Sequence, residues 1–316
     1  MAGPKTHTEA VILLPMARFI CTVLLLTCVA CEAPLPAPVK PPDPPTEPPS
    51  DEELLAARPY SVRTPPGYDA DAGTTWPLVV ALHGYGGSAM ETVNYYSLDR
   101  LAESRGFFLF APNGLPDARG NRAWNPGRSR WPEWDRSWLT AALRDIKRKY
   151  QIDATRVIVF GASQGAHMAH RMGCDGSEDV TAVISVAGQL TTDPQLCAPT
   201  RPVTALQIHG TADEAIGYYG DLQNVPPKPD IPSAHDTIGV WARNDGCSGM
   251  LEVAAISPIN ISEFVDGPET IVETYAGCPN GVAVGLWSMQ GVQHRPLPTP
   301  DFSSRAIGFG LARPRQ

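Results

Sequence analysis

The sequence lacks several features that mark other functional classes. It has no cluster of lysine and arginine and a net charge of −8, whereas nucleic-acid binding needs basic residues gathered on one surface. No apolar run reaches the roughly 18 residues of a membrane-spanning helix, and no repeat recurs at a fixed period. The 316 residues, of which 43% are hydrophobic, suffice for one large core. We therefore expect one domain of catalytic size and no nucleic-acid partner.

The N-terminal region predicts export. Arg18 precedes the apolar stretch 19–30, "FICTVLLLTCVA", which ends in small residues as a secretory signal does. The ending "CVAC" resembles a bacterial lipobox, although Cys28 stands where leucine is usual, and it would make Cys31 the lipidated first residue. An ordinary cleaved signal peptide is the alternative. We expect residues 1–31 to form a signal peptide with a lipobox. The mature protein would then be secreted, or attached to the outer side of a bacterial membrane by its lipid alone.

Nine prolines follow between residues 32 and 50. A proline-rich segment stays extended at roughly 3 Å per residue and buries no core. Such a segment could hold a domain ~50 Å from a lipid anchor. We expect residues 32–52 to form a linker and residues 53–316 to form the catalytic domain.

Four cysteines remain in the predicted domain: Cys174, Cys197, Cys247 and Cys278. An even number of cysteines in an exported protein predicts two disulfides, which could be connected in three ways. These four cysteines do not have the spacing of a zinc site, either with one another or with histidine. We therefore expect disulfides here, and neither a metal nor a cofactor.

Short apolar segments alternate with helical patterns through the predicted domain. The apolar segments lack polar alternation, which indicates strands covered on both faces. Strands that alternate with helices of about ten or more residues imply right-handed crossovers. The expected fold class is α/β, with three layers and a mostly parallel sheet that has helices on both faces. The expected strands are 76–84, 106–114, 156–163, 182–188, 203–213, 269–277 and 282–291, with an edge strand in 58–68, and the expected helices are 90–104, 138–150, 165–173, 233–245 and 301–312.

A candidate nucleophile lies in "FGASQGAHMAH", residues 160–170. Ser163 stands between Gly161 and Gly165, directly after a predicted buried strand and before a predicted helix. This G-x-S-x-G pattern at a strand-to-helix junction is typical of a nucleophile elbow, in which the glycines make room for a strained serine. A serine that merely caps the helix is the alternative.

A serine hydroxyl becomes nucleophilic only beside a base that a carboxylate orients. The sequence offers these groups in the order Ser, Asp, His, each after a predicted strand. Asp213 ends "ALQIHGTAD" and His294 ends "VGLWSMQGVQH". Alone, Asp213 could cap a loop and His294 could be a surface histidine. Together with Ser163 they predict a triad, and the backbone amides of Tyr85, in "LHGYGGSA", and Gln164 are the predicted oxyanion donors.

The other histidines are expected to be structural. His83 and His209 each precede a glycine at a predicted strand end, where hydrogen bonds to loops are their expected role. His167 and His170 lie on the helix after Ser163 and are expected to pack or to support the site.

A tryptophan-rich segment, "WNPGRSRWPEWDRSW", is the candidate for substrate binding. Trp124, Trp131 and Trp134 could stack on an aromatic acid or a sugar ring, because flat aromatic faces suit both. Filling of the core under a long loop is the alternative for these three. Trp138 lies at helical spacing and is expected in the core.

Several of these motifs occur together in one known family. "LHGYGGS", "APNG", "DATRVIVFGASQGAHMAHRM", "HGTAD", "WARNDGC" and "GVQH" resemble the secreted α/β hydrolases grouped as polyhydroxybutyrate depolymerase-like and feruloyl esterase-like. The resemblance covers about residues 60–310. It implies the α/β-hydrolase fold and the triad Ser163, Asp213 and His294. It also implies a disulfide between Cys247 and Cys278, which leaves Cys174 with Cys197.

Two residues depart from the family pattern. Gln164 stands where the family often has asparagine, and "GVQHRPLP" places Arg295 where an aromatic residue often lies. The second departure concerns the substrate pocket more than the chemistry. The family cleaves polyesters and feruloyl or acetyl esters of plant polysaccharide.

The expected function is that of an extracytoplasmic serine esterase. It would hydrolyse carboxylic esters through an acyl-enzyme, as a monomer whose partner is its ester substrate. Feruloyl or acetyl esters of polysaccharide and hydroxyalkanoate polyesters or oligomers are the candidate substrates. A serine peptidase of the same fold is one alternative. A surface lipoprotein that keeps the hydrolase fold but only binds its ligand is the other.

Overall fold

A computed structural model describes residues 49–126, 134–190, 197–220 and 231–316. The predicted signal peptide, the candidate lipidation site Cys31 and most of the predicted linker lie outside these ranges. Within them, none of the helices combines the length and the apolar character needed to cross a membrane.

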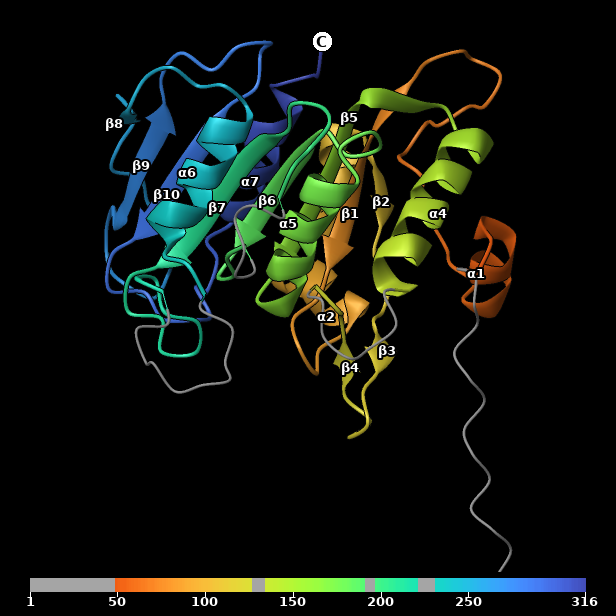
Figure 1. The fold of residues 1–316 in the computed structure, drawn as a ribbon, viewed down its shortest axis with the longest axis horizontal. Coiled ribbons are helices and arrows are strands. Elements are labelled where there is room, and N and C mark those ends of the chain that lie inside the picture. Colours follow the sequence, from red (N-terminus) through yellow and green to blue (C-terminus); the bar gives the residue numbers. More distant parts are fainter. Residues whose placement is uncertain (1–48, 127–133, 191–196, 221–230) are drawn as a thin grey trace, which may run out of the picture. The chain divides into compact units, whose positions relative to one another are not determined.

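The strands of the described domain form one large sheet and one small hairpin. The sheet contains β1 (Trp76–Leu82), β2 (Phe108–Phe110), β5 (Ile152–Ala162), β6 (Ala182–Val186), β7 (Thr204–Gly210), β8 (Leu251–Val253), β9 (Thr270–Tyr275) and β10 (Val284–Met289), and the hairpin contains β3 (Leu115–Pro116) and β4 (Arg122–Ala123). Within the described residues the sheet has eight strands in the order β2-β1-β5-β6-β7-β10-β9-β8 (Figure 1). Pairs from β2 to β10 are parallel, and β9 and β8 add antiparallel pairs at one edge. The predicted α/β class with a mostly parallel sheet is confirmed.

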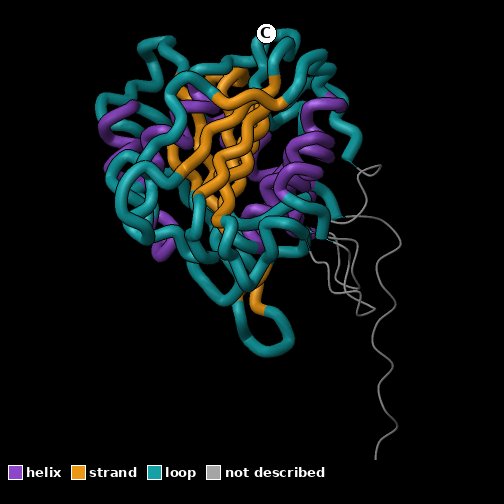
Figure 2. The backbone as a smooth tube through the Cα atoms, turned by 90° about the vertical axis from the view of Figure 1, so that its left-hand side faces the viewer, coloured by secondary structure: helices purple, strands orange, loops and turns teal. Residues whose placement is uncertain are grey.

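Helices cover both faces of this sheet, as Figure 2 shows in a view where the strands run between two groups of helices. The helices are α1 (Asp51–Ala57), α2 (Ala89–Tyr95), α3 (Leu98–Arg105), α4 (Trp134–Lys149), α5 (Gln164–Asp175), α6 (Ala234–Asn244) and α7 (Phe302–Leu311). Alternate residues of β1 belong to two separate cores. Leu78 and Val80 join the core with α4, α5 and α6, whereas Val79 and Ala81 join the core with α3 and α7. All four side chains are buried, which explains why β1 shows no polar alternation.

Two expected elements differ in the structure. Residues 58–68 form no strand, because only an isolated antiparallel bridge joins Arg63 to Leu109. Pro65 and Pro66 follow after Thr64 and have no N–H to extend the pairing. The expected helix 90–104 is divided into α2 and α3 at Ser97, whose φ of 50° does not fit a right-handed helix.

Two disulfides fasten loops to the helices. Cys174, near the end of α5, is joined to Cys197, and Cys247, after α6, is joined to Cys278, after β9. These are the pairs that the family resemblance implies. Each bond closes a loop and so reduces the conformational entropy of the unfolded chain, typically stabilising a domain by about 2–4 kcal/mol.

A buried carboxyl group at the end of α6 makes stability depend on pH. Asp245 is 4% exposed, and Oδ1 accepts a hydrogen bond from the Val203 amide at 3.0 Å. No group among the described residues donates to Oδ2. Burial raises the pKa of Asp245 from 3.8 to about 7, so the ionised form is disfavoured in the folded protein.

We predict that Asp245→Asn stabilises the protein at high pH only. Because the folded pKa of Asp245 lies above the unfolded value, the wild-type side chain destabilises nothing below pH 3.8, and wild type loses stability as the pH rises from there through about 7. Asparagine stays neutral, so the variant should exceed wild type by about 2–4 kcal/mol in the free energy of unfolding at pH 8.5. The difference should shrink towards pH 4. Urea unfolding at both pH values measures it, and an equal difference at both would contradict the raised pKa.

Candidate active site

Ser163 lies in a strained turn between β5 and α5. Its φ is 55° and its ψ is −122°, and its side chain makes no hydrogen bond that caps the helix. The neighbouring glycines have no space for a side chain. A Cβ on Gly161 would lie 2.0 Å from the Gly165 carbonyl oxygen, and a Cβ on Gly165 would lie 2.2 Å from the Leu82 carbonyl oxygen. The geometry therefore has the features of a nucleophile elbow and lacks those of a simple helix cap.

The three predicted triad residues lie within hydrogen-bonding distance of one another. His294 Nδ1 is 2.7 Å from Asp213 Oδ2, and His294 Nε2 is 3.0 Å from Ser163 Oγ. Because a carboxylate only accepts, Nδ1 carries the proton and Nε2 is left to accept from the serine. The residues follow β5, β7 and β10, whose parallel directions bring their carboxyl ends to one edge of the sheet.

Asp213 is held by donors on both of its oxygens. Oδ1 accepts from the amides of Ala215 and Ile216 at 2.9 Å each, and Oδ2 accepts from His294 and from His209 Nε2 at 3.1 Å. Burial opposes ionisation of this carboxyl group, but hydrogen bonds from His209, His294 and Ile216 outweigh it and hold its pKa well below the usual range. Asp213 is therefore a carboxylate at neutral pH.

The turn after β1 lies against Ser163. A Cβ on Gly84 would lie 3.2 Å from the Ser163 Cβ, so Tyr85 follows a residue in close contact with the serine. Within the described residues, no backbone carbonyl accepts from the amides of Tyr85 or Gln164. The Gln164 amide also lies in the first turn of α5, where the helix dipole favours negative charge. The Tyr85 hydroxyl donates to Asp117 Oδ2 at 2.7 Å, which ties this turn to the β3–β4 hairpin.

A cleft of about 740 Å³ opens at Ser163 and His294. Its lining includes Tyr95 and Arg295, whose guanidinium carbon lies 5.0 Å from the centre of the Tyr95 ring. Sequence reasoning missed Tyr95, because it sits in a helical stretch without a motif. The other lining residues are Gly84, Tyr85, Gly86, Gly87, Ser88, Glu91, Thr92, Asn94, Tyr96, Ala162, Val186 and Ala187.

The interpretation of Trp124 as a substrate contact is wrong for this structure. Trp124 is 2% exposed, its indole N–H donates to the His83 carbonyl at 2.9 Å, and Arg58 lies over its ring. It belongs to the hydrophobic core, which was the alternative. Trp131 and the side chain of Trp134 lie outside the described residues. Trp138 is buried in the core, as expected.

His83 holds loops, as expected. His83 Nε2 accepts from the Gly114 amide at 2.8 Å, and His83 Nδ1 donates to the Gly84 carbonyl at 2.7 Å. His167 was expected to pack or to support the site, and its Nδ1 donates to the Gln189 carbonyl at 2.5 Å. His209 differs, because it contacts the Asp213 carboxylate directly. The sequence signal was present, since His209 and Asp213 share the motif "HGTAD".

Known proteins share this fold and parts of this sequence. Residues 70–221 match the family model described as phospholipase/carboxylesterase. Feruloyl esterase B of Piromyces equi is 28% identical over 74% of this chain and 42% of that protein. A bifunctional acetylxylan esterase/xylanase of Neocallimastix patriciarum is 23% identical over 70% of this chain and 29% of that protein. The chain therefore spans less than half the length of these two relatives.

A solved structure supports the fold over more of the chain. The acetyl xylan esterase from Aspergillus awamori aligns with a TM-score of 0.55 over 79% of this chain and 93% of that chain, at 15% identity. A mostly parallel sheet with helices on both faces and an elbow after β5 defines an α/β hydrolase. The chain therefore has the α/β-hydrolase fold, and parts of its sequence are similar to esterases.

We predict that the elbow does not tolerate Gly161→Ala. The new Cβ would meet backbone atoms, which cannot move aside, so the free energy of unfolding should fall by about 3 kcal/mol or more. Gly308→Ala in α7 is the matched control, because a Cβ there meets no atom within 4 Å. That variant should gain about 0.5–1 kcal/mol from helix propensity. Thermal and urea unfolding measure both, and similar values for the two variants would contradict the close packing.

Proposed function

We propose that this protein is a serine esterase that hydrolyses carboxylic esters through an acyl-enzyme. The observation that carries the proposal is the hydrogen-bonded series Ser163, His294 and Asp213 at the open cleft. Its geometry gives a hydroxyl, a base and an orienting carboxylate in the order that nucleophilic catalysis requires. The esterase relatives favour an ester over other acyl compounds.

In the proposed reaction, Ser163 Oγ attacks the ester carbonyl carbon while His294 Nε2 accepts the hydroxyl proton. The amides of Tyr85 and Gln164 donate to the oxyanion that develops, and Asp213 stabilises the charged imidazole. The bond to the alcohol oxygen then breaks, and that oxygen takes the proton from His294. Water attacks the acyl-enzyme and gives a proton to His294. Release of the carboxylic acid returns the proton to Ser163.

The proposed substrates are feruloyl or acetyl esters of polysaccharide, or hydroxyalkanoate polyesters and oligomers. The names of the relatives favour the polysaccharide esters. The Tyr95 ring gives the cleft an aromatic wall that suits a flat acyl group. We further propose that the protein works outside the cytoplasm, secreted or held by a lipid on Cys31. Its two disulfides support an oxidising compartment.

The two alternatives fit less well. A peptidase of this fold would need a site for a peptide terminus, and the sequence shows no motif for one. A protein that only binds its ligand would not need a serine, a histidine and a carboxylate within hydrogen-bonding distance of one another. The esterase proposal uses each of these groups.

We predict that Ser163→Ala abolishes ester hydrolysis. Purified wild type should hydrolyse p-nitrophenyl acetate, methyl ferulate or a hydroxybutyrate oligomer, and the variant should lose about 10⁴-fold or more in kcat because no acyl-enzyme forms. Ser104→Ala, on an exposed face of α3, is the control and should keep wild-type activity. If wild type and Ser163→Ala were equally inert on all three esters, the esterase proposal would be wrong.

We predict that Tyr95→Ala affects an aromatic acyl group more than a small one. Loss of the ring should raise KM for methyl ferulate by about 10-fold, while KM for p-nitrophenyl acetate changes little. Tyr95→Phe keeps the ring and should leave both values near wild type. Steady-state kinetics on both esters measures the ratio, and an equal rise for both would remove Tyr95 from the acyl site.

A further inference from the structure

A row of buried hydrogen bonds leads from α6 to the Asp213 carboxylate. Trp241 Nε1 lies 3.0 Å from His170 Nδ1, and His170 Nε2 lies 3.0 Å from Gln207 Oε1. Gln207 Nε2 then lies 3.1 Å from His209 Nδ1, and His209 Nε2 lies 3.1 Å from Asp213 Oδ2. Trp241, His170, Gln207 and His209, the buried network, have no exposed surface.

The two ends of the buried network fix the direction of every bond in it. An indole N–H only donates, so His170 Nδ1 must accept from Trp241. Burial lowers the pKa of His170 to about 4, so its ring is neutral and carries its one proton on Nε2. That proton is donated to Gln207 Oε1, which leaves the amide nitrogen of Gln207 to donate to His209.

The tautomer of His209 follows from this sequence of donors. Because His209 Nδ1 accepts from Gln207, its proton is on Nε2, between Asp213 Oδ2 and the Ile216 carbonyl at 2.8 Å. The other tautomer would turn a nitrogen lone pair towards a carboxylate, and the two would repel each other. One N–H of His209 thus contacts both the carboxylate and the turn that carries it.

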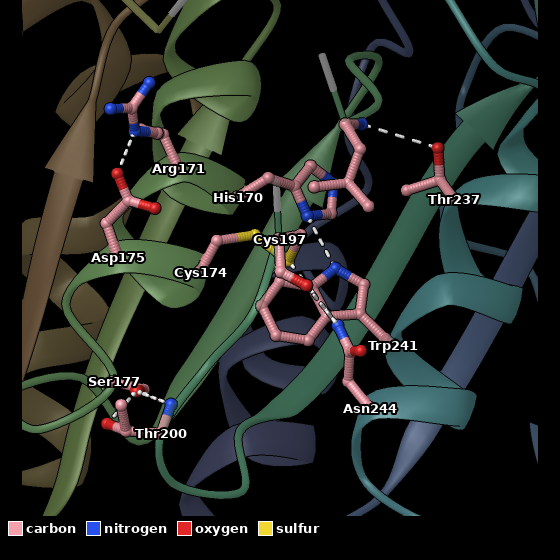
Figure 3. The surroundings of a disulfide bond; sticks show 11 residues. His170, Arg171, Cys174, Asp175, Ser177, Cys197, Thr200, Thr237, Trp241 and Asn244 are labelled. Atoms are coloured by element: carbon pink, nitrogen blue, oxygen red, sulfur yellow. Dashed lines mark hydrogen bonds and ion pairs between the residues drawn. A yellow bond between two sulfur atoms is a disulfide. The ribbon is translucent and has the colours of Figure 1, made fainter. Parts of the chain in front are cut away.

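The far end of the buried network is anchored by a disulfide (Figure 3). Cys174 lies one turn after His170 on α5 and is bonded to Cys197. Asn244, about one turn after Trp241 on α6, donates from Nδ2 to the Cys197 carbonyl at 2.9 Å. His170 and Trp241 face each other beside the Cys174–Cys197 disulfide. Helices α5 and α6 are therefore fixed where the Trp241 indole N–H meets His170 Nδ1.

We propose that the buried network positions the Asp213 carboxylate by setting the tautomer of His209. The proposal rests on the proposed esterase function and assigns positioning roles to residues that do not line the cleft. Asp213 Oδ2 is directed at His294 by a second donor, His209, which is itself aligned by Gln207, His170 and Trp241. Breaking the network should therefore reduce catalysis without changing substrate binding.

A double-mutant cycle tests this coupling. Gln207→Met keeps the volume of the side chain and removes both hydrogen bonds, and it should lower kcat by about 10-fold or more with little change in KM. Trp241→Phe should lower kcat by about 3-fold, because His170 then has two tautomers. The double variant should be no slower than Gln207→Met alone, since the network is already broken.

Trp138→Phe is the matched control. Trp138 is also buried and also donates its indole N–H, to the Arg58 carbonyl at 2.9 Å, but it lies outside the buried network. Trp138→Phe should leave kcat near wild type. In a double variant with Gln207→Met, the two fold-changes in kcat should multiply. If Trp241→Phe and Trp138→Phe reduced kcat equally, or if the Trp241 and Gln207 effects multiplied, the proposal would be overturned.

A second readout does not require turnover. Nitrogen-15 NMR of histidine-labelled protein distinguishes protonated from unprotonated ring nitrogens. Wild type should show His170 and His209 protonated on Nε2, and Trp241→Phe should give His170 in both forms while Trp138→Phe does not. Unchanged tautomers in Trp241→Phe and Gln207→Met would overturn the proposal even if kcat fell. A wild type with these tautomers but no activity on any ester would instead reject the proposed function.

Discussion

The close contact of backbone with backbone around Ser163 is the constraint on which the site depends. Gly165 packs against the Leu82 carbonyl at the end of β1, and Gly161 packs against Gly165 across the turn. Only residues without a Cβ allow this approach, and it holds Ser163 at a positive φ. The strain places the hydroxyl above the sheet edge, where the loops after β7 and β10 supply Asp213 and His294. Parallel strands make that meeting possible, because their carboxyl ends share one edge.

Much of this arrangement could be predicted from local patterns. The strands β1, β5, β6, β7 and β10 each contain a short apolar run, and Ser163, Asp213 and His294 each follow one of these strands. The order of the strands in the sheet then determines that Ser163, Asp213 and His294 meet at one edge. The expected edge strand in 58–68 was wrong because Pro65 and Pro66, at the end of the alternating pattern, cannot donate the hydrogen bonds that would extend the bridge at Arg63. The split between α2 and α3 depends on the positive φ of Ser97, which no residue pattern in this segment predicts.

Side-chain surroundings could not be predicted in the same way. Trp138 was correctly placed in the core from its helical spacing, whereas Trp124 lies outside a helix, and only its packing against distant segments shows that it is buried. His209 was expected to hold a loop, and it also donates to Asp213. The contacts of His170 with Trp241 and Gln207 join residues that are 71 and 37 positions apart. Such long-range pairs leave no periodic signal in the sequence.

Helix α5 carries parts of the site at both of its ends. Ser163 precedes its first residue, His170 projects from its middle, and Cys174 fastens its last turn. A sliding or fraying of this one helix would displace the serine and the partner of Trp241 at the same moment. The molecule therefore has no arrangement in which the serine stays aligned while α5 is loose. Heat or proteolysis that frees α5 should therefore disrupt the whole site in one step, and no partly assembled site should remain.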